Sequence, residues 1–455
     1  MRHGRDKRRV FLDRRPPGPK GLPLVGSLGE LARDALGFLT MCSRQYGDVV
    51  GMRLGTWPTL LLNRPDDIEE VLVRHHSNFV KHRFFWRHVT ALFGKGLLTS
   101  EGEFWQKQRR LAAPAFSNHR LTSYGDTMVR HTVRTVEGWQ AGEIRNIHRE
   151  LMGLTYRIAA KTLFDSDIEQ NADDIHSDVN AAVREIASRL ARPFVIPDAF
   201  PIPGHIRYRR VVRRIDRFIA RVIEKQRTRP PNQGDLLSIL MSARDETGQP
   251  MPDRQLRDEA VTLLLAGHET TALALSWTFY LLGRHPDVDA ELAAEVQSVL
   301  NDREATVDDL PRLTFTEHVV TEAMRLYPPA WFFGREALHD CEIGGYPVRA
   351  RTTVLMSPWV LHRDPRFYDA PGAFRPGRWS NDLARKLPRF AYMPFGGGPR
   401  ICIGNRFAMM EAVLILATVI QRFRLEWQSD RPVVPRPSIT LRPQGGVWVK
   451  LLARS

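Results

Sequence analysis

The chain has 455 residues, of which 43% are hydrophobic, with three cysteines and a formal net charge of +15. This length can bury a large core, whereas three widely spaced cysteines exclude a disulfide framework and the four-thiolate cradle of an iron–sulfur cluster. The basic residues are dispersed and not gathered into one run with stacking aromatics, so we expect no nucleic-acid binding and favour an acidic protein partner.

The chain begins with a basic tail, residues 1–15, and a stiff proline-rich segment opens at Pro16. The apolar stretch of the tail, Val10-Phe11-Leu12, is far too short for a signal peptide or a membrane span. We therefore expect a soluble, cytoplasmic protein without a transmembrane anchor. Because no linker, repeat or low-complexity tract divides the rest, residues 16–455 are expected to form one domain.

The first regular structure predicted is a β-hairpin. Residues 49–55 and 59–63 alternate as strands do, with a turn from Gly55 to Pro58. From about Pro65 to Tyr327 the pattern is largely helical and is punctuated by prolines. Short strands return at 353–356 and 446–449, so the sequence predicts a mainly α protein with small β-sheets.

Two features of the helical region have open interpretations. Trp105 and Arg109 lie one helical turn apart, so the indole N–H and the guanidinium can reach one anionic group. The apolar segment 192–203 contains four prolines and cannot be helical. It is either a lid at a substrate entrance or a loop packed on the core.

Residues 257–282 form the most hydrophobic predicted helix, apolar on nearly all faces and therefore buried. Within it lies Ala266-Gly267-His268-Glu269-Thr270-Thr271. The Thr270 hydroxyl can bond to the carbonyl of Ala266 or Gly267 and open a local bulge for water. Alternatively, the threonine only satisfies itself and the glutamate pairs with a distant arginine.

A helix that ends at Pro328 carries Glu322 and Arg325, three residues apart and able to pair. Alone, this spacing is typical of solvated surface pairs. Farther along, Arg378 lies in the segment Phe374-Arg375-Pro376-Gly377-Arg378-Trp379.

The most informative segment is Pro394-Phe395-Gly396-Gly397-Gly398-Pro399-Arg400-Ile401-Cys402-Ile403-Gly404, which is followed by a predicted apolar helix, Asn405 to Arg422. Glycines permit tight backbone paths around a sulfur and a flat cofactor. Backbone N–H groups and the positive end of the helix would stabilise a thiolate. A zinc or structural cysteine site would need neighbouring Cys or His ligands, and this loop contains none.

The pattern Phe395, Gly398, Arg400, Cys402 and Gly404 resembles the haem-binding loop of the cytochrome P-450 family. The segment from Ala266 to Thr271 resembles that family's oxygen-activation motif, and Glu322, Arg325 and Arg378 resemble its structural triad. The matches run in the family's order over essentially the whole chain, and the chain looks like a soluble bacterial-type member.

The resemblance implies a single haem domain and haem b, with Cys402 as the axial iron ligand. It implies that Thr270 and Glu269 deliver protons for oxygen activation and that Gly267 belongs to the same catalytic motif. Further residues are implied to contact the haem or its propionates: Phe395, Gly398, Arg400, Gly404, Trp105, Arg109 and Arg335. The implied substrate pocket includes Phe85, Ala266, Ala330 and Phe332.

The function implied is a monooxygenase that inserts one atom of O2 into an apolar substrate by hydroxylation or epoxidation. Fatty acids, terpenes, steroids and polyketides remain open. The chain contains no flavin or nicotinamide fingerprint, so electrons are expected from a separate ferredoxin or flavodoxin and its reductase. Lys107, Arg110 and Arg406 are candidate docking cations. The alternatives are a peroxide-driven peroxygenase of the same fold, which generally lacks the acid–alcohol pair, and a non-catalytic haem sensor or carrier.

Overall fold

The computed structural model describes residues 14–165, 178, 181–182, 184–186, 188–189, 200, 202–228, 234–428 and 430–454. These residues group into two compact units. The first unit contains the chain up to Trp86 with residues 325–373 and 381–402, and the second contains residues 87–324, 374–380 and 403 onward. Most of the basic tail and most of the proline-rich segment 192–203 lie outside the described residues.

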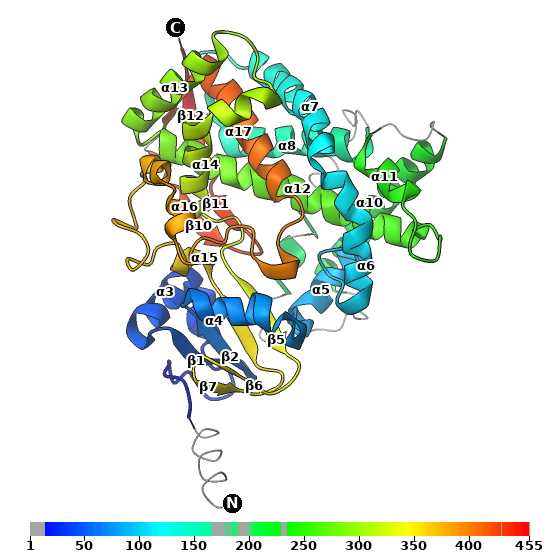
Figure 1. Cartoon of the computed structure of the whole chain (residues 1–455), viewed down its shortest axis with the longest axis vertical. Helices are drawn as coiled ribbons and strands as arrows, with labels where there is room; N and C mark the ends of the chain where they lie inside the picture. Colours follow the sequence, from blue (N-terminus) through cyan, green and yellow to red (C-terminus); the bar gives the residue numbers. More distant parts are fainter. Residues whose placement is uncertain are drawn as a thin grey trace, which may run out of the picture. The chain divides into compact units, whose positions relative to one another are not determined.

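A five-stranded sheet, in the order β1-β2-β8-β5-β3, forms the centre of the first unit (Figure 1). The predicted hairpin is confirmed, because β1 (Val49–Leu54) pairs antiparallel with β2 (Trp57–Leu62). The turn is shorter than predicted and contains only Gly55 and Thr56. β2 runs parallel to the predicted strand β8 (Thr353–Met356), and β5 (Phe333–Ala337) lies antiparallel between β8 and β3 (Phe79–Val80).

The remaining elements of the first unit surround this sheet. β6 (Cys341–Ile343) and β7 (Tyr346–Val348) form a separate hairpin. The helices are α2 (Leu28–Arg33), α3 (Ala35–Tyr46), α4 (Pro65–Glu69), α15 (Pro358–Leu361) and α16 (Leu383–Lys386), and α5 (Arg83–Phe93) begins in this unit. A π-helical turn, Glu70–Arg74, follows α4 directly.

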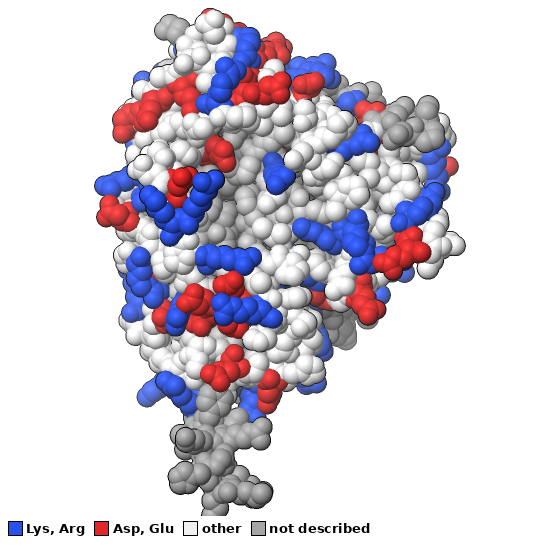
Figure 2. All heavy atoms as spheres, in the orientation of Figure 1, with Lys and Arg blue, Asp and Glu red and all other residues white. Residues whose placement is uncertain are grey.

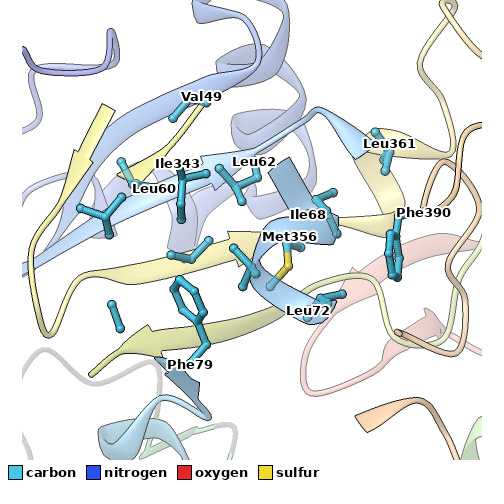
Figure 3. Close-up of a cluster of buried hydrophobic side chains, with 14 of the residues drawn as sticks. Val49, Leu60, Leu62, Ile68, Leu72, Phe79, Ile343, Met356, Leu361 and Phe390 are labelled. Atoms are coloured by element: carbon cyan, nitrogen blue, oxygen red, sulfur yellow. The ribbon is translucent and has the colours of Figure 1, made fainter. Parts of the chain in front are cut away.

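Buried side chains from the sheet and from the α4 region form the core of the first unit (Figure 3). Leu60 and Leu62 lie two residues apart on β2 and so point to the same face, where they join Ile68 and Leu72. Burying one such side chain contributes about 1.5–3 kcal/mol. This packing fixes the turn at Leu72, whose backbone lies against the cysteine loop.

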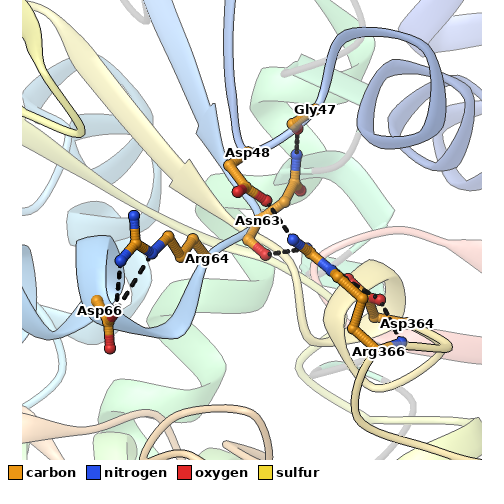
Figure 4. Close-up of polar contacts among 7 residues, drawn as sticks. All are labelled: Gly47, Asp48, Asn63, Arg64, Asp66, Asp364 and Arg366. Atoms are coloured by element: carbon orange, nitrogen blue, oxygen red, sulfur yellow. Dashed lines mark hydrogen bonds and ion pairs between the residues drawn. The ribbon is translucent and has the colours of Figure 1, made fainter.

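Polar contacts tie the ends of β1 and β2 to the chain after α15 (Figure 4). Arg366 donates to the carboxylates of Asp48 and Asp364 and to the carbonyl of Asn63, at 2.6, 2.6 and 3.0 Å. The Asn63 side chain in turn donates to the carbonyl of Gly47 at 2.7 Å. Each exposed ion pair contributes little, typically below about 1 kcal/mol. Together, however, these contacts orient the ends of β1 and β2, because the three acceptors share the guanidinium of Arg366.

The second unit is mainly helical, and its long helix α12 (Asp253–Leu282) is buried on nearly every turn. The helix begins at Asp253, directly after Pro252 and four residues before the predicted start at Arg257. The prediction missed this first turn because the turn is polar. α12 packs along α8 (Ile147–Phe164), while the predicted helix α17 (Asn405–Arg422) packs on α7 (Asn118–Glu137) and on α12 (Figure 1).

Further elements complete the second unit. The other helices are α6 (Gly102–Ala112), α10 (Pro203–Arg227), α11 (Leu236–Ser242), α13 (Pro286–Leu300) and α14 (Thr314–Leu326), the last of which belongs to this unit up to Met324. β4 (Ile144–Asn146), β12 (Trp448–Ala453) and β9 (Phe423–Trp427) form one small sheet, and β10 (Val434–Pro437) pairs with β11 (Leu441–Gln444). The prediction of a mainly α protein with small sheets is confirmed. The last strand, predicted at 446–449, begins at Trp448.

Candidate active site

The cysteine loop lies in the first unit up to Cys402. The Cys402 N–H donates to the carbonyl of Phe395 at 3.0 Å, which closes the loop, and the thiol-bearing residue is exposed. Gly396 and Gly398 have φ values of +69° and +66°, which favour glycine. At Gly398 a Cβ would lie 1.8 Å from the carbonyl oxygen of Leu72, so a larger residue has no room. The sequence therefore fixes a tight loop with an accessible sulfur.

Arg400 and Gly404, two of the residues predicted to contact the haem, lie on either side of Cys402 in the chain. Arg400 is half-buried at the end of a 3-10 turn (Gly398–Arg400), and Gly404 caps the start of α17. Among the residues that the structure describes, no group of three or more His, Cys, Asp or Glu side chains could hold a metal ion. A zinc site around Cys402 would require such a group.

In the second unit, α12 loses its burial at one face near its middle. Ala266 is exposed and Gly267 and Thr270 are half-buried, whereas the residues on either side are buried. These three positions share a face of the helix. A Cβ on Gly267 would meet no atom within 4 Å, so space lies beside the backbone here. The predicted motif therefore presents a hydroxyl and bare backbone on an accessible face.

The Thr270 hydroxyl donates to the carbonyl of Ala266 at 2.7 Å, as the sequence predicted. The predicted bulge is wrong, because the chain is α-helical without interruption from Asp253 to Leu282. A carbonyl has two lone pairs, so it can accept the hydroxyl and the helical N–H together. The hydroxyl oxygen keeps its own lone pairs on the accessible face.

Glu269 is 7% exposed and points to the C-terminal hairpin. Its Oε1 accepts hydrogen bonds from Arg442 Nη2 at 2.6 Å and from Thr440 Oγ1 at 2.6 Å. Burial alone would raise the pKa of Glu269, but the charge of Arg442 and these hydrogen bonds outweigh burial and lower it. This carboxylate is therefore ionised and paired with a distant arginine, which is the structural interpretation that the sequence left open.

A second carboxyl, which sequence reasoning missed, lies inside the same unit. Glu411 of α17 is 1% exposed, and neither of its oxygens has a hydrogen bond of good geometry among the described residues. Burial raises its pKa to about 8, and the neighbouring Thr271 hydroxyl of α12 offsets this only in part. The available signal was a lone acid within the apolar run Ala408-Met409-Met410-Glu411-Ala412-Val413.

The three residues of the predicted structural triad lie in two separate sets of contacts. Glu322 of α14 is fully buried and accepts from Arg378 Nε and Trp379 Nε1, both at 2.9 Å, and from the backbone N–H of Arg375 at 3.0 Å. Arg325 is also fully buried, and it donates to carbonyls of the 362–373 segment at 2.7–3.0 Å. These are buried structural contacts and not surface ion pairs.

The other predicted contacts fall on several elements. Trp105 is buried and Arg109 half-buried, one turn apart on α6, and Arg335 lies on β5, where its guanidinium is 5.8 Å from the ring centre of Phe333. Ala330 and Phe332 are half-buried beside β5. Phe85 lies on α5, but its side chain is outside the described structure.

Two of the three predicted docking cations are neutralised within the second unit. Lys107 pairs with Asp245 at 2.6 Å, and Arg110 pairs with Glu246 at 2.7 Å. Arg406 donates to the side chain of Asn118 at 2.6 Å, which leaves its charge uncompensated by that contact. Figure 2 shows basic and acidic residues interspersed over the drawn face.

Comparison with known proteins gives the same family as the cysteine loop. The cytochrome P450 family model matches residues 16–449. Cyclooctatin synthase of Streptomyces melanosporofaciens is 37% identical over 93% of this chain and 92% of its own, and the cyclooctat-9-en-7-ol 5-monooxygenase of that organism is 36% identical over 93% and 90%. Pentalenene oxygenase of Streptomyces avermitilis is 32% identical over 96% and 97%. In the described part of the chain, no helix is long and apolar enough to span a membrane. The family match and these relatives show that the chain belongs to the cytochrome P450 family of haem-thiolate monooxygenases.

Proposed function

We propose that this enzyme oxygenates a terpene-like hydrocarbon or its alcohol, with haem b held by Cys402 and electrons supplied by a separate ferredoxin or flavodoxin and its reductase. The observation that carries the proposal is the accessible Cys402 thiol in a closed glycine loop. The substrate class is supported by relatives whose names specify pentalenene, an alkene, and cyclooctat-9-en-7-ol, an alkenol.

The residues present fit a haem. Cys402 offers a soft anionic ligand, and Gly398 admits no side chain against the loop. On α12, a Cβ at Gly267 would meet no atom within 4 Å, so the backbone of the oxygen-activation motif is open there. Trp105 and Arg109 of α6 are suited to bind a carboxylate of that group, because an indole N–H and a guanidinium both donate.

When bound, a thiolate-ligated haem supplies the chemistry that activates O2 and oxygenates an unactivated C–H bond or an alkene. The protein's part is to orient the substrate, exclude water and deliver protons. Thr270 is the proton-handling group of our proposal, because its hydroxyl is accessible and anchored to Ala266. Glu269 orients this turn of α12 through Arg442, and its ionised state makes it a poor direct proton donor at neutral pH.

The first experiment tests the cofactor ligand. The purified protein is reduced with dithionite, treated with carbon monoxide and compared with the Cys402→His variant. We expect a strongly red-shifted Soret band for the unmodified protein and a band typical of histidine ligation, or no haem, for the variant. If the unmodified protein lacks the red-shifted band, the assignment of Cys402 is wrong.

A second experiment tests turnover. Electron consumption, product and peroxide are measured for Thr270→Ala and for the conservative variant Thr270→Ser. We expect the alanine variant to release peroxide and to yield less product per electron, and the serine variant to retain most of the yield. A sensor or carrier would show no turnover to uncouple, and a full product yield from Thr270→Ala would refute the role of the hydroxyl.

The substrate class is tested by ligand-induced spin-state changes. Cyclic terpenes and their monoalcohols are compared with fatty acids, steroids and macrocyclic polyketides of similar size. We expect the terpene group to give the largest shifts, followed by a hydroxylated or epoxidised product in turnover. Exclusive responses to one of the other classes would replace this part of the proposal. Turnover with hydrogen peroxide alone, at the rate of the complete system, would favour the peroxygenase.

A further inference from the structure

A short loop, residues 94–98, lies directly against the first third of α12. Gly94 has a φ of +61°, and a Cβ there would lie 1.9 Å from an oxygen of Asp258. At Gly96 a Cβ would lie 2.1 Å from the hydroxyl oxygen of Thr262. Only glycines allow the loop backbone to approach the helix this closely.

Three consecutive polar contacts fasten the loop to the helix. Asp258 accepts the Lys95 N–H at 2.7 Å, and Glu259 accepts the Leu97 N–H at 2.9 Å. Gln255 donates to the carbonyl of Lys95 at 3.1 Å and to Glu259 Oε1 at 2.8 Å. The loop is therefore held by side chains of one helix.

The loop also connects to a functional element. Thr99 donates to the carbonyl of Gly94 at 2.7 Å, so the loop closes on itself. Three residues later α6 begins at Gly102, and this helix carries Trp105 and Arg109. A displacement of the loop from α12 would therefore shift the start of α6.

Glu259 is the most deeply buried member of this cluster. Its exposed fraction is 0%, and its carboxyl has Asp258 beside it in the chain. The positive charge of Arg257 is shared between Asp258 on the same helix and Asp216 of α10. Burial, and to a smaller extent the charge of Asp258, raises the pKa of Glu259 to about 7 even though the contacts with Leu97 and Gln255 lower it.

We propose that Glu259, assisted by Asp258 and Gln255, is a positioning residue that fixes the 94–98 loop on α12 and thereby the start of α6, and that its protonation sets how firmly the loop is held. The part that concerns Trp105 and Arg109 as haem contacts rests on the proposed function. The hold on the loop itself does not.

The sign of the pH effect follows from linkage. In the closed loop Glu259 has a pKa near 7, whereas an opened loop would return the carboxyl to water and to its ordinary value of 4.5. The closed state binds the proton more tightly, so opening becomes more favourable as the pH rises from about 4.5 to about 7 and then levels off. Between pH 6 and pH 8 the opening equilibrium should increase roughly tenfold.

Amide hydrogen exchange of residues 95–97 in the purified full chain tests this inference. After correction for intrinsic exchange, the protection of these amides should fall roughly tenfold from pH 6 to pH 8. In Glu259→Gln, which keeps an acceptor for the Leu97 N–H but cannot ionise, protection should be high and independent of pH. Glu224→Gln removes a carboxylate that is 72% exposed on α10, and should behave as the unmodified protein does.

A second readout connects the loop to the cofactor. Haem transfer to an acceptor protein should be several-fold faster from Glu259→Ala than from Glu259→Gln. If Glu259→Gln retains the pH dependence of exchange at 95–97, or if Glu259→Ala protects these amides fully, the positioning role is refuted. If the protein lacks the thiolate-haem band but exchange follows Glu259, the proposed function fails while the hold on the loop stands.

Discussion

At the scale of single residues, two buried carboxyls, Glu269 of α12 and Glu411 of α17, have opposite electrostatic environments. Glu269 is paired with Arg442, which lowers its pKa, whereas burial raises the pKa of Glu411 to about 8. A carboxylate that is buried without a partner disfavours its charged form. Glu411 is therefore mostly protonated at neutral pH, and Glu269 is ionised.

This contrast predicts a pH dependence of stability. The folded state binds the Glu411 proton more tightly than the unfolded state, whose ordinary pKa is 4.5, so the free energy of unfolding falls as the pH rises from about 4.5 to about 8. Glu411→Gln should remove this contribution. Relative to the unmodified protein, its stability should increase by about 2 kcal/mol between pH 6 and pH 8.

Urea unfolding at the two pH values measures this difference. Glu426→Gln is the control, because Glu426 is an exposed carboxylate of β9 and should not change the pH dependence. Equal slopes for Glu411→Gln and the unmodified protein would mean that Glu411 is solvated or paired in solution.

The sequence predicts contacts between residues that are close along the chain. It does not predict which distant residues meet. The Thr270 contact with Ala266 spans four residues and follows from helix geometry. Arg442 lies 173 residues after Glu269, and no local pattern indicates that the two meet. The sequence left both interpretations of Glu269 open for this reason, and only the folded hairpin of β10 and β11 decides between them.

At the scale of elements, the cysteine loop depends on one close backbone approach. Gly396 and Gly398 both have positive φ, but a Cβ meets nothing at Gly396 and meets the Leu72 carbonyl at Gly398. Gly396→Ala should cost about 1–2 kcal/mol from its conformation alone. Gly398→Ala adds a backbone clash and should sharply reduce the fraction of protein that carries thiolate-ligated haem.

The pair makes a matched test, since each variant adds one methyl group to the same loop. Haem content per chain and the melting temperature are measured for both. Equal loss in the two variants would show that backbone conformation, and not the contact with Leu72, limits this position.

A buried carboxylate of α14 also organises the segment 375–379. Glu322 accepts from two side chains and one backbone N–H, so removing it breaks its buried ion pair with Arg378 and two further hydrogen bonds. Breaking a buried pair in this way typically costs about 3–5 kcal/mol. We therefore expect Glu322→Ala to lower the free energy of unfolding by about that amount, as measured by urea unfolding.

Glu317→Ala provides the control for this prediction, because Glu317 lies on α14 as well but is exposed. It should change stability by less than about 0.5 kcal/mol. A similar small change for Glu322→Ala would mean that Arg378 and Trp379 find other acceptors.

The elements themselves were predicted well where periodicity is strong. α17 and β8 have the predicted bounds, because each is a long or continuous apolar run between clear breakers. The start of α12 was placed too late because its first turn, from Asp253, is polar. Two- and three-residue strands such as β3 and β4 gave no signal, because they form only by pairing with distant strands.

At the scale of the whole molecule, the sequence predicts one domain and the described residues group into two compact units. Both units are discontinuous, so the chain passes between them within regular structure, for example between Met324 and Arg325 of α14. Composition reveals a boundary only where a linker joins two domains. Discontinuous units such as these need no linker, so composition does not reveal them. The family model from residue 16 to 449 includes both units.

The net charge of +15 leads to a prediction about electron transfer at this scale. A proposed acidic ferredoxin should be attracted over distances comparable with the Debye length, which falls from about 10 Å at 0.1 M salt to about 3 Å at 1 M. Its rate of reducing the haem, measured by stopped flow, should therefore fall steeply with salt. Arg406→Gln should lower the rate several-fold at low salt, because the contact of this cation with the Asn118 amide does not neutralise its charge.

The double variant Lys107→Gln with Asp245→Asn separates local from total charge. It removes a pair whose charges already cancel, so it should leave both the rate and its salt dependence unchanged. Arg424→Gln, at an exposed position of β9, lowers the net charge as much as Arg406→Gln does. If both single variants slow reduction equally, the total field governs encounter and Arg406 is no docking contact; if only Arg406→Gln does, the partner docks beside the start of α17, three residues after the cysteine.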